Sequence, residues 1–428
     1  MKKIGIIRRT LILSFLLAII SAFAGCDDSG DIIKNELVTV HGRVVNDFGS
    51  SISGASVACL YGGTQISTSS SDGSFTLNRI KVPYDLYLVY NGKAVVYKDV
   101  KSLAPQLNTF NNASGFDNYC RINLSVPPIN PNQAVSAWFV DTTGIVQGDS
   151  TCVGNGSISF PVGWQGASVM IGRVMILVYT LDNNGRPLTY DNYGSKPAAL
   201  VNTGMCTLSF SANDMDIDPG ETSINCQLFV PAGTNSIGCA LYIGSKSYFN
   251  YFNKGFHLFG SDEGGMNYSI VAPDSGSLFM YYLVTNTANN DVYSNKVTNI
   301  HLGNSNVNLD NPTILISPSN NANAVDYKTQ FSFFSDNNNG VYRTIFSGDS
   351  TGTYSLNILS KTPSTTIPDL SFLGVFPDLQ KNYSWHVIKY SNLNNIDDFV
   401  LNDLELNPIL SSVSNSETRF FRFSSNPK

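Results

Sequence analysis

Residues 348–352, Gly-Asp-Ser-Thr-Gly, fit the G-x-S-x-G pattern in which the serine of a hydrolase acts as a covalent nucleophile. That pattern works by exposing the serine, here Ser350, on a tight turn between a strand and a helix. The residues that follow, 354–358, alternate as a strand does, and no parallel βαβ order precedes them. We interpret the segment as a hairpin between sandwich strands and expect mutation of Ser350 to change no esterase activity.

A second group of candidate residues is acidic. Asp214, Asp216 and Asp218 stand at alternate positions and could converge on Ca²⁺ as the ligands of an EF-hand loop do. Position six of that loop would be Pro219 instead of glycine, and position twelve would be Asn225 instead of glutamate. We therefore favour an acidic interdomain turn without metal, with a lone structural calcium as the alternative.

Aromatic residues offer a third kind of site. Trp138 and Trp164 could stack on sugars, although such residues more often fill a core. His386 stands beside Trp385, and strand alternation predicts that it faces solvent. The sequence has no Cys-x-x-Cys spacing, phosphate loop or paired catalytic carboxylates, and its histidines are scattered, at 41, 257, 301 and 386. We predict no bound metal, no cofactor and no enzymatic activity.

The amino terminus has the layout of a signal peptide. Residues 1–9 supply four cationic side chains, residues 10–23 an almost uninterrupted apolar run, and two small residues precede Cys26. Positive charge stays on the cytoplasmic side while the apolar segment enters the bilayer, and small residues admit the peptidase. The apolar run is shorter than the roughly 20 residues that span a membrane comfortably, so we predict a cleaved leader over 1–25.

Residues 23–26, Phe-Ala-Gly-Cys, resemble the lipobox of bacterial lipoproteins. The resemblance implies that the sulfur of Cys26 takes a diacylglycerol and that the amino group freed by cleavage is then acylated. An ordinary leader cut near Ala24, with Cys26 incidental, is the alternative. Residues 26–36 would form a lipidated tether. Its acidic cluster at 27–31 resembles the surface-export signal of Bacteroidetes lipoproteins, which implies an outer-membrane location, surface-exposed or periplasmic. In enterobacteria an aspartate there would imply inner-membrane retention.

Composition predicts an all-β protein. Charged residues are only 14%, whereas abundant glycine with 25 Phe and 21 Tyr favours strands joined by turns. A chain of 428 residues is expected to form two to four domains. Subtracting the number of Asp and Glu from that of Lys and Arg gives a net charge of 26 − 32 = −6. Removal of the four leader cations takes the net charge of the mature chain to 22 − 32 = −10. A net negative chain repels phosphate backbones, so no nucleic-acid partner is expected.

Residues 37–125 form the first predicted domain. Alternating stretches with glycine at the turns predict strands in 38–47, 52–57 and 71–77. This succession resembles the carboxypeptidase regulatory-like domain, a small seven-stranded sandwich related to transthyretin. In that family the glycine corresponding to Gly42 lies in the first strand, and the residue corresponding to Phe75 is an aromatic core residue. The resemblance implies a spacer or folding accessory without peptidase chemistry.

The proline-rich residues 126–131 predict a stiff linker. Beyond it, 132–218 and 219–305 each have the length of an immunoglobulin-like sandwich. Residues 312–425 resemble a fibronectin type III domain. Two features carry the resemblance, namely an opening strand that ends in proline and a Tyr-x-Trp-x-Val run at 383–387. Alternation predicts that the tyrosine, tryptophan and valine of this run face the core.

The cysteines fit this partition. With Cys26 lipidated, six remain, two in each of the first three domains. Several connectivities are possible, and the domain assignment selects Cys59 with Cys120, Cys152 with Cys206, and Cys226 with Cys239. An exported protein meets an oxidising environment, so we predict these three disulfides.

Together these features favour a non-catalytic role. We predict a lipid-anchored cell-envelope protein whose tandem antiparallel β-sandwiches form a rod, end to end, and act as an adhesion, scaffold or binding module. Its expected partners are the membrane, through the lipid, and an unidentified protein or glycan. A glycan-binding accessory lipoprotein is the alternative, and an envelope hydrolase is the less favoured third hypothesis.

Overall fold

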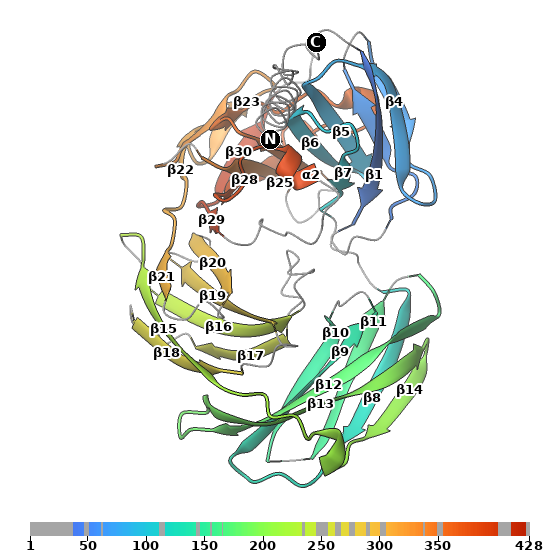
Figure 1. Cartoon of the computed structure of the whole chain (residues 1–428). Coiled ribbons are helices and arrows are strands. Elements are labelled where there is room, and N and C mark those ends of the chain that lie inside the picture. Colours follow the sequence, from blue (N-terminus) through green and yellow to red (C-terminus); the bar gives the residue numbers. More distant parts are fainter. Residues whose placement is uncertain are drawn as a thin grey trace, which may run out of the picture.

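The computed structural model describes residues 37–46, 51–60, 63–110, 116–142, 146–154, 156–164, 166–232, 236–244, 256–261, 267–273, 279–287, 292–299, 305–336, 339–348, 354–400 and 412–424. Nearly all their regular structure is strand, arranged in mostly antiparallel sheets (Figure 1), which confirms the predicted all-β class of tandem sandwiches. The strands fall into four units, namely unit 1 (37–110), unit 2 (116–215), unit 3 (222–308) and unit 4 (313–424).

Unit 1 is a sandwich. One sheet has the order β4-β1-β7, from β1 (Val38–Val45), β4 (Ser74–Ile80) and β7 (Gln106–Asn108). The facing strands have the order β3-β2-β5-β6, from β2 (Ser56–Cys59), β3 (Gln65–Thr68), β5 (Tyr84–Tyr90) and β6 (Lys93–Val100). Burial alternates along β4, where Phe75 and Leu77 face the core between exposed neighbours. This is the period of two that the sequence predicts for a half-buried strand.

Unit 2 begins one strand earlier than predicted. β8 (Asn118–Ser125) pairs with β11 (Ser157–Trp164) and β14 (Gly204–Ser209), not with strands of unit 1. The opposite sheet has the order β10-β9-β12-β13, from β9 (Gln133–Asp141), β10 (Val146–Val153), β12 (Val169–Leu181) and β13 (Pro187–Val201). Ile122 and Leu124 of β8 pack in the core between these sheets. The proline-rich residues 126–131 therefore connect two strands of one sandwich, and the predicted domain linker there is wrong.

Unit 3 also has two sheets. The short 3-10 helix η2 (Ala212–Asp214) ends unit 2 and precedes the first strand of unit 3. One sheet has the order β18-β15-β21, from β15 (Thr222–Phe229), β18 (Asn267–Ala272) and β21 (Ser305–Asn308). The other strands have the order β17-β16-β19-β20, from β16 (Ser236–Gly244), β17 (Phe256–Ser261), β19 (Phe279–Thr287) and β20 (Tyr293–Asn299).

Unit 4 is built around an aromatic core. One sheet has the order β22-β24-β27, from β22 (Ile314–Ser317), β24 (Phe331–Phe334) and β27 (Ser364–Thr365). The other elements are β23 (Ala322–Val325), β25 (Val341–Gly348), β26 (Ser355–Ser360), η4 (Ser371–Leu373), β28 (Asn382–Tyr390), α2 (Asp397–Val400), β29 (Val413–Asn415) and β30 (Arg419–Phe423). The ring centroids of Phe331 and Trp385 lie 5.1 Å apart. Tyr383, Trp385 and Val387 share the buried face of β28, so that prediction is confirmed.

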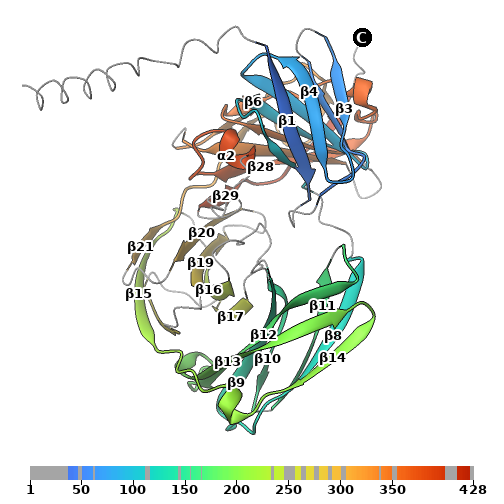
Figure 2. The same cartoon turned by 45° about the vertical axis from the view of Figure 1, so that its right-hand side comes forward.

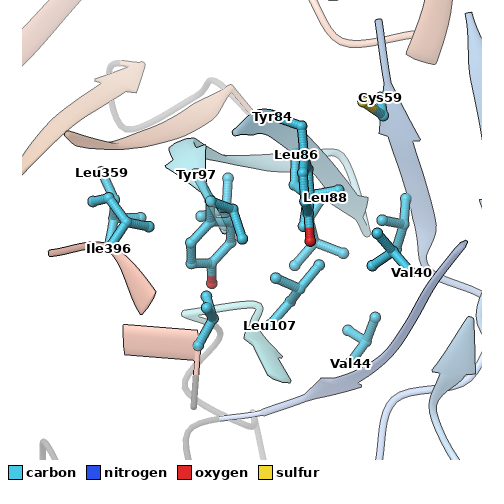
Figure 3. Close-up of a cluster of buried hydrophobic side chains, with 14 of the residues drawn as sticks. Val40, Val44, Cys59, Tyr84, Leu86, Leu88, Tyr97, Leu107, Leu359 and Ile396 are labelled. Carbon is cyan, nitrogen blue, oxygen red and sulfur yellow. The ribbon is translucent and has the colours of Figure 1, made fainter. Parts of the chain in front are cut away.

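Units 1 and 4 share one continuous sheet. β26 runs parallel to β6, with Leu356 opposite Ala94 and Ile358 opposite Val96. Figure 3 shows Leu359 and Ile396, both of unit 4, beside Tyr97 in the core of unit 1. The predicted end-to-end rod is therefore wrong for these units, because apolar side chains of the last sandwich complete the interior of the first. We call units 1 and 4 together the base.

The same sheet continues from the base into unit 3. β29 lies between β20 and β28, so that three residues near the end of the chain connect strands of two units. Figure 2 shows β20 and β28 on either side of β29. The resulting order through the three units is β17-β16-β19-β20-β29-β28-β25-β26-β6-β5-β2-β3.

The packing of Gly42 against Phe75 can be tested by overpacking. The two residues stand opposite each other, and a Cβ built on Gly42 would lie 2.2 Å from Cζ of Phe75 and 2.6 Å from the backbone oxygen of Pro105, which remains in every variant. The Gly42→Ala variant should lower the free energy of unfolding by roughly 1–3 kcal/mol, measured by urea denaturation. In a Phe75→Leu background the smaller side chain should reduce this loss. An equal loss in both backgrounds would contradict the packing described.

The shared sheet predicts that units 1 and 4 lose stability together. Ile358 is 1% exposed, and Ile358→Ala should cost about 2–5 kcal/mol through the cavity it leaves. Hydrogen exchange should then accelerate in β6 as well as in β26, because their ladder opens as one. Leu124→Ala, in the core of unit 2, is the matched control and should leave β6 protected. Unchanged exchange in β6 of the Ile358→Ala variant would show that the two units open separately.

Candidate functional site

The residue predicted to carry lipid, Cys26, lies outside the described residues, as does the predicted leader over 1–25. Within the described part of the chain, no helix is long and apolar enough to cross a membrane. Lipid attachment at Cys26 therefore stays a prediction, with the sequence around it as its support.

The cysteines occupy places that differ from the predicted pairing. Cys59 packs in the core of unit 1, whereas Cys120 on β8 packs in the core of unit 2, so their predicted disulfide is wrong. The error follows from the assignment of β8 to the first domain. Cys152 and Cys206 both border the core of unit 2, but they stand in opposite sheets and no disulfide joins them.

Burial raises the pKa of the Cys152 and Cys206 thiols. The thiolate, which is the form that attacks electrophiles and binds metal, is therefore scarce at neutral pH. Cys226 on β15 and Cys239 on β16 stand in two different sheets, and their side chains lie outside the described residues. Their pairing stays a prediction.

The G-x-S-x-G segment joins two antiparallel strands. β25 ends at Gly348, β26 begins at Ser355, and Ser347 stands opposite Ser355. Ser350 itself lies outside the described residues. The element that follows is a strand and not the helix that a nucleophile elbow requires, so the hairpin interpretation is confirmed.

The aspartates near 214–218 have separate partners. Asp214 accepts a hydrogen bond from Ser211 Oγ at 2.6 Å and pairs with Lys196 at 2.9 Å, and these contacts lower the pKa of its carboxyl group. Asp218 accepts a hydrogen bond from the Gly220 amide at 2.8 Å. In the described ranges, no three His, Cys, Asp or Glu side chains gather so that they could hold a metal. The stretch is a turn between β14 and β15.

The tryptophans proposed for sugar stacking are buried. Trp138 and Trp164 are each 2% exposed, and Trp164 belongs to the core of unit 2. Neither ring offers a face to a glycan, so the expectation that these residues more often fill a core is confirmed and the sugar platform is not. His386 points away from the core that holds Trp385, as alternation predicts, but it is partly buried and does not face solvent freely.

A buried polar cluster lies where units 3 and 4 meet. Lys389 on β28 is 1% exposed, and its Nζ donates to Ser335 Oγ at 2.9 Å. Asp310 lies between the units, where its carboxylate accepts a hydrogen bond from Ser412 Oγ and its carbonyl accepts one from Ser294 Oγ, both at 2.5 Å. We call Ser294, Asp310, Ser335, Lys389 and Ser412 the polar joint.

Lys389 supplies the positive charge of the polar joint. Burial lowers the pKa of its ammonium group, while the carboxylates of Asp310 and Asp336 act in the opposite direction. A buried ammonium needs hydrogen bonds and opposite charge around it, and the joint provides both. The sequence analysis missed this residue. The alternation of β28, if it is extended two positions beyond Val387, places Lys389 on the buried face.

Exposed apolar side chains form cross-strand pairs on two units. Ile314 on β22 stands opposite Phe334 on β24, and both are exposed on unit 4. Val169 on β12 stands opposite Val201 on β13, and both are exposed on unit 2. Each pair places two exposed apolar side chains next to each other on a sheet face.

No protein-family model matches the chain, and no curated protein matches its sequence. Among solved structures it is similar to the Bacillus anthracis TIE protein, at 10% identity over 64% of this chain and 50% of that one, with a TM-score of 0.16. It is also similar to the fimbrial anchor protein Mfa2 from Porphyromonas gingivalis, at 9% identity over 43% of this chain and 79% of that one, with a TM-score of 0.18.

A third similar structure is a fimbrial assembly protein from Parabacteroides distasonis, at 8% identity over 51% of this chain and 95% of that one, with a TM-score of 0.15. Such low TM-scores support no conclusion about fold or function. The resemblances to the carboxypeptidase regulatory-like and fibronectin type III families therefore stay predictions.

The polar joint can be tested through the pH dependence of stability. Because the pKa of Lys389 in the folded chain lies below its ordinary 10.5, the unfolded chain binds this proton more tightly. The lysine therefore makes the free energy of unfolding rise as pH approaches 10.5 from below. In urea denaturation at several pH values, this rise should be smaller in Lys389→Met than in the parent chain.

Lys98 provides the control for that measurement. Despite its burial, the hydrogen bond to Asp85 raises the pKa of Lys98, so its stabilising contribution is complete below 10.5 and is lost as pH rises through the folded value. Lys98→Met should therefore change the pH slope in the opposite direction. Identical slopes for Lys389→Met and the parent chain would contradict the assignment of Lys389.

Proposed function

We propose that the chain is a lipid-anchored protein of the bacterial cell envelope and that its folded part is a non-catalytic adhesion, scaffold or binding module. The observation that carries the proposal is the leader that ends in Phe-Ala-Gly-Cys at 23–26, directly before an acidic cluster. The same cluster favours the outer membrane as the place of attachment, with the folded units on the surface or in the periplasm.

The arrangement of the units supports a presenting role. The base joins the beginning and the end of the folded chain through β6 and β26. Units 2 and 3, with strands β8 to β21, lie together on one side of the base (Figure 1). A base that is anchored near its amino terminus can therefore hold two further sandwiches toward a partner.

The chemistry of the described residues favours binding over hydrolysis. Burial disfavours the thiolate form of Cys152 and Cys206, which is the nucleophilic form. The carboxylate of Asp214 is already engaged by Ser211 and Lys196. The two tryptophans that suggested glycan binding, Trp138 and Trp164, are buried and cannot stack on a sugar. A protein partner is favoured instead, because exposed apolar pairs on units 2 and 4 suit protein contacts better than sugar hydroxyls.

Replacement of Cys26 tests the anchor. The full precursor is expressed in a bacterial host, the membranes are separated, and the amino-terminal peptide is analysed by mass spectrometry. The parent chain should sediment with membranes and carry a diacylglycerol and an acyl chain on Cys26. Cys26→Ala should lose both lipids and move to the soluble fraction, because the sulfur is the attachment atom.

Cys206→Ala is the matched control, since it also removes one thiol but lies in unit 2, and it should remain lipidated. A parent chain whose leader is cleaved but whose Cys26 carries no lipid would overturn the proposed anchoring.

A further inference from the structure

One end of unit 1 combines exposed apolar and cationic side chains. Leu37, Leu60 and Ile66 are 41%, 48% and 51% exposed. Arg79 is exposed near the end of β4, and Lys81, which is half-buried, follows directly after that strand. We call these five residues the tip.

Contacts between neighbouring strands bring the apolar members of the tip to the end of β4. The backbone amide of Asn78 on β4 donates to Gln65 Oε1 at 3.1 Å, which places the start of β3, and with it Ile66, beside β4. Gln65 is in turn opposite Cys59, so that Leu60 lies at the end of the same hairpin.

Arg79 is held in an unusual backbone conformation. Val38 is opposite Ile80 but Val40 is opposite Leu77, so β4 carries an extra residue at this point and forms a bulge. Within the bulge Arg79 has a φ of 55°, in the left-handed region that costs a branched or long side chain energy. Bulges re-aim side chains, and the strained conformation of Arg79 persists because the pairing of β1 with β4 holds it.

The cations of the tip are available to an anionic partner. Neither Arg79 nor Lys81 takes part in an ion pair within the described part of the chain. The whole chain carries 26 Lys and Arg against 32 Asp and Glu, so two neighbouring cations stand out against a negative background. Phosphate groups of lipids would neutralise them.

The tip also lies where the chain enters the folded part. Leu37 is the first described residue, and 37 − 26 = 11 Cα-to-Cα steps join it to Cys26, which limits the distance between them to about 40 Å. Figure 2 shows that β1 begins at the end of the base that is farthest from units 2 and 3 and runs toward them. An anchor at Cys26 would thus hold the tip close to the bilayer and units 2 and 3 away from it.

We propose that the tip rests on the membrane surface, with Leu37, Leu60 and Ile66 in the headgroup layer and with Arg79 and Lys81 on lipid phosphates. This inference rests on the proposed lipid anchor at Cys26. The exposed apolar area of three side chains is far below the roughly 800 Å² that each partner contributes to a stable protein interface. A weak contact suffices on a membrane, because the tether keeps the tip at a high effective concentration.

Fluorescence quenching by brominated lipids tests this contact directly. The three native tryptophans, Trp138, Trp164 and Trp385, are buried in units 2 and 4, so a tryptophan introduced at the surface can be distinguished by its quenching. The lipidated full chain with Leu60→Trp is reconstituted into vesicles of phosphatidylcholine and phosphatidylglycerol with brominated acyl chains. The matched control is Ile171→Trp, on the exposed face of unit 2.

The Leu60→Trp chain should be quenched and the Ile171→Trp chain should not. Adding Arg79→Asn and Lys81→Gln to Leu60→Trp should weaken the contact by roughly fivefold per cation removed. Asparagine tolerates the left-handed conformation, so Arg79→Asn should melt no earlier than the parent, and lost quenching cannot then be attributed to unfolding.

Mass spectrometry of the same samples separates the two proposals. If Cys26 is lipidated but Leu60→Trp is quenched no more than Ile171→Trp, the tip proposal is overturned and the anchor stands. If quenching does not change when both cations are removed, the proposed role of Arg79 and Lys81 is overturned. If Cys26 carries no lipid, the anchor and the tip proposal both fail.

Discussion

The parallel pairing of β6 with β26 is the contact on which the arrangement of the whole chain depends. It joins residues 355 − 93 = 262 positions apart, and closing so long a loop costs conformational entropy that local structure cannot repay. The compensation comes from two interiors that neither unit completes alone, since Leu359 packs with unit 1 and Val96 with unit 4. Units 2 and 3 consequently form one long insertion in the chain between unit 1 and unit 4, the two halves of the base.

β29 adds a second link of a different kind. It contributes only three residues between β20 and β28, of which Val413 packs in the apolar core of unit 1, whereas Ser414 and Asn415 are buried polar residues. Buried charges such as Lys389 contribute little net stability but penalise arrangements that leave them unpaired, so the polar joint can select one position of unit 3 against the base. Apolar packing thus stabilises the base, whereas buried hydrogen bonds to Asp310 from Ser294 and Ser412 lie at its junction with unit 3.

Much of the local structure could be predicted from the sequence, whereas the errors concern contacts between segments far apart in the chain. Alternation correctly placed Tyr383, Trp385 and Val387 on a buried face, and the hairpin around 348–355 followed from the strand after it. The proline-rich residues 126–131 were mistaken for a linker, because a connection between two sheets of one sandwich has the same composition as a connection between domains. The wrong pairing of Cys59 with Cys120 followed from that boundary, since β8 carries Cys120 into the core of unit 2.

The sequence by itself determined the all-β class and the positions of most strands, because each depends on side-chain order within a short window. Only the tertiary structure decided which sheet edges meet. The hydrogen bonds at the edge of a sheet are made by backbone groups, which differ little from residue to residue. The side chains of β6 therefore do not show that β26 pairs with it. The burial of Trp138, the polar joint around Lys389 and the placement of the tip away from units 2 and 3 all follow from pairings of this long-range kind.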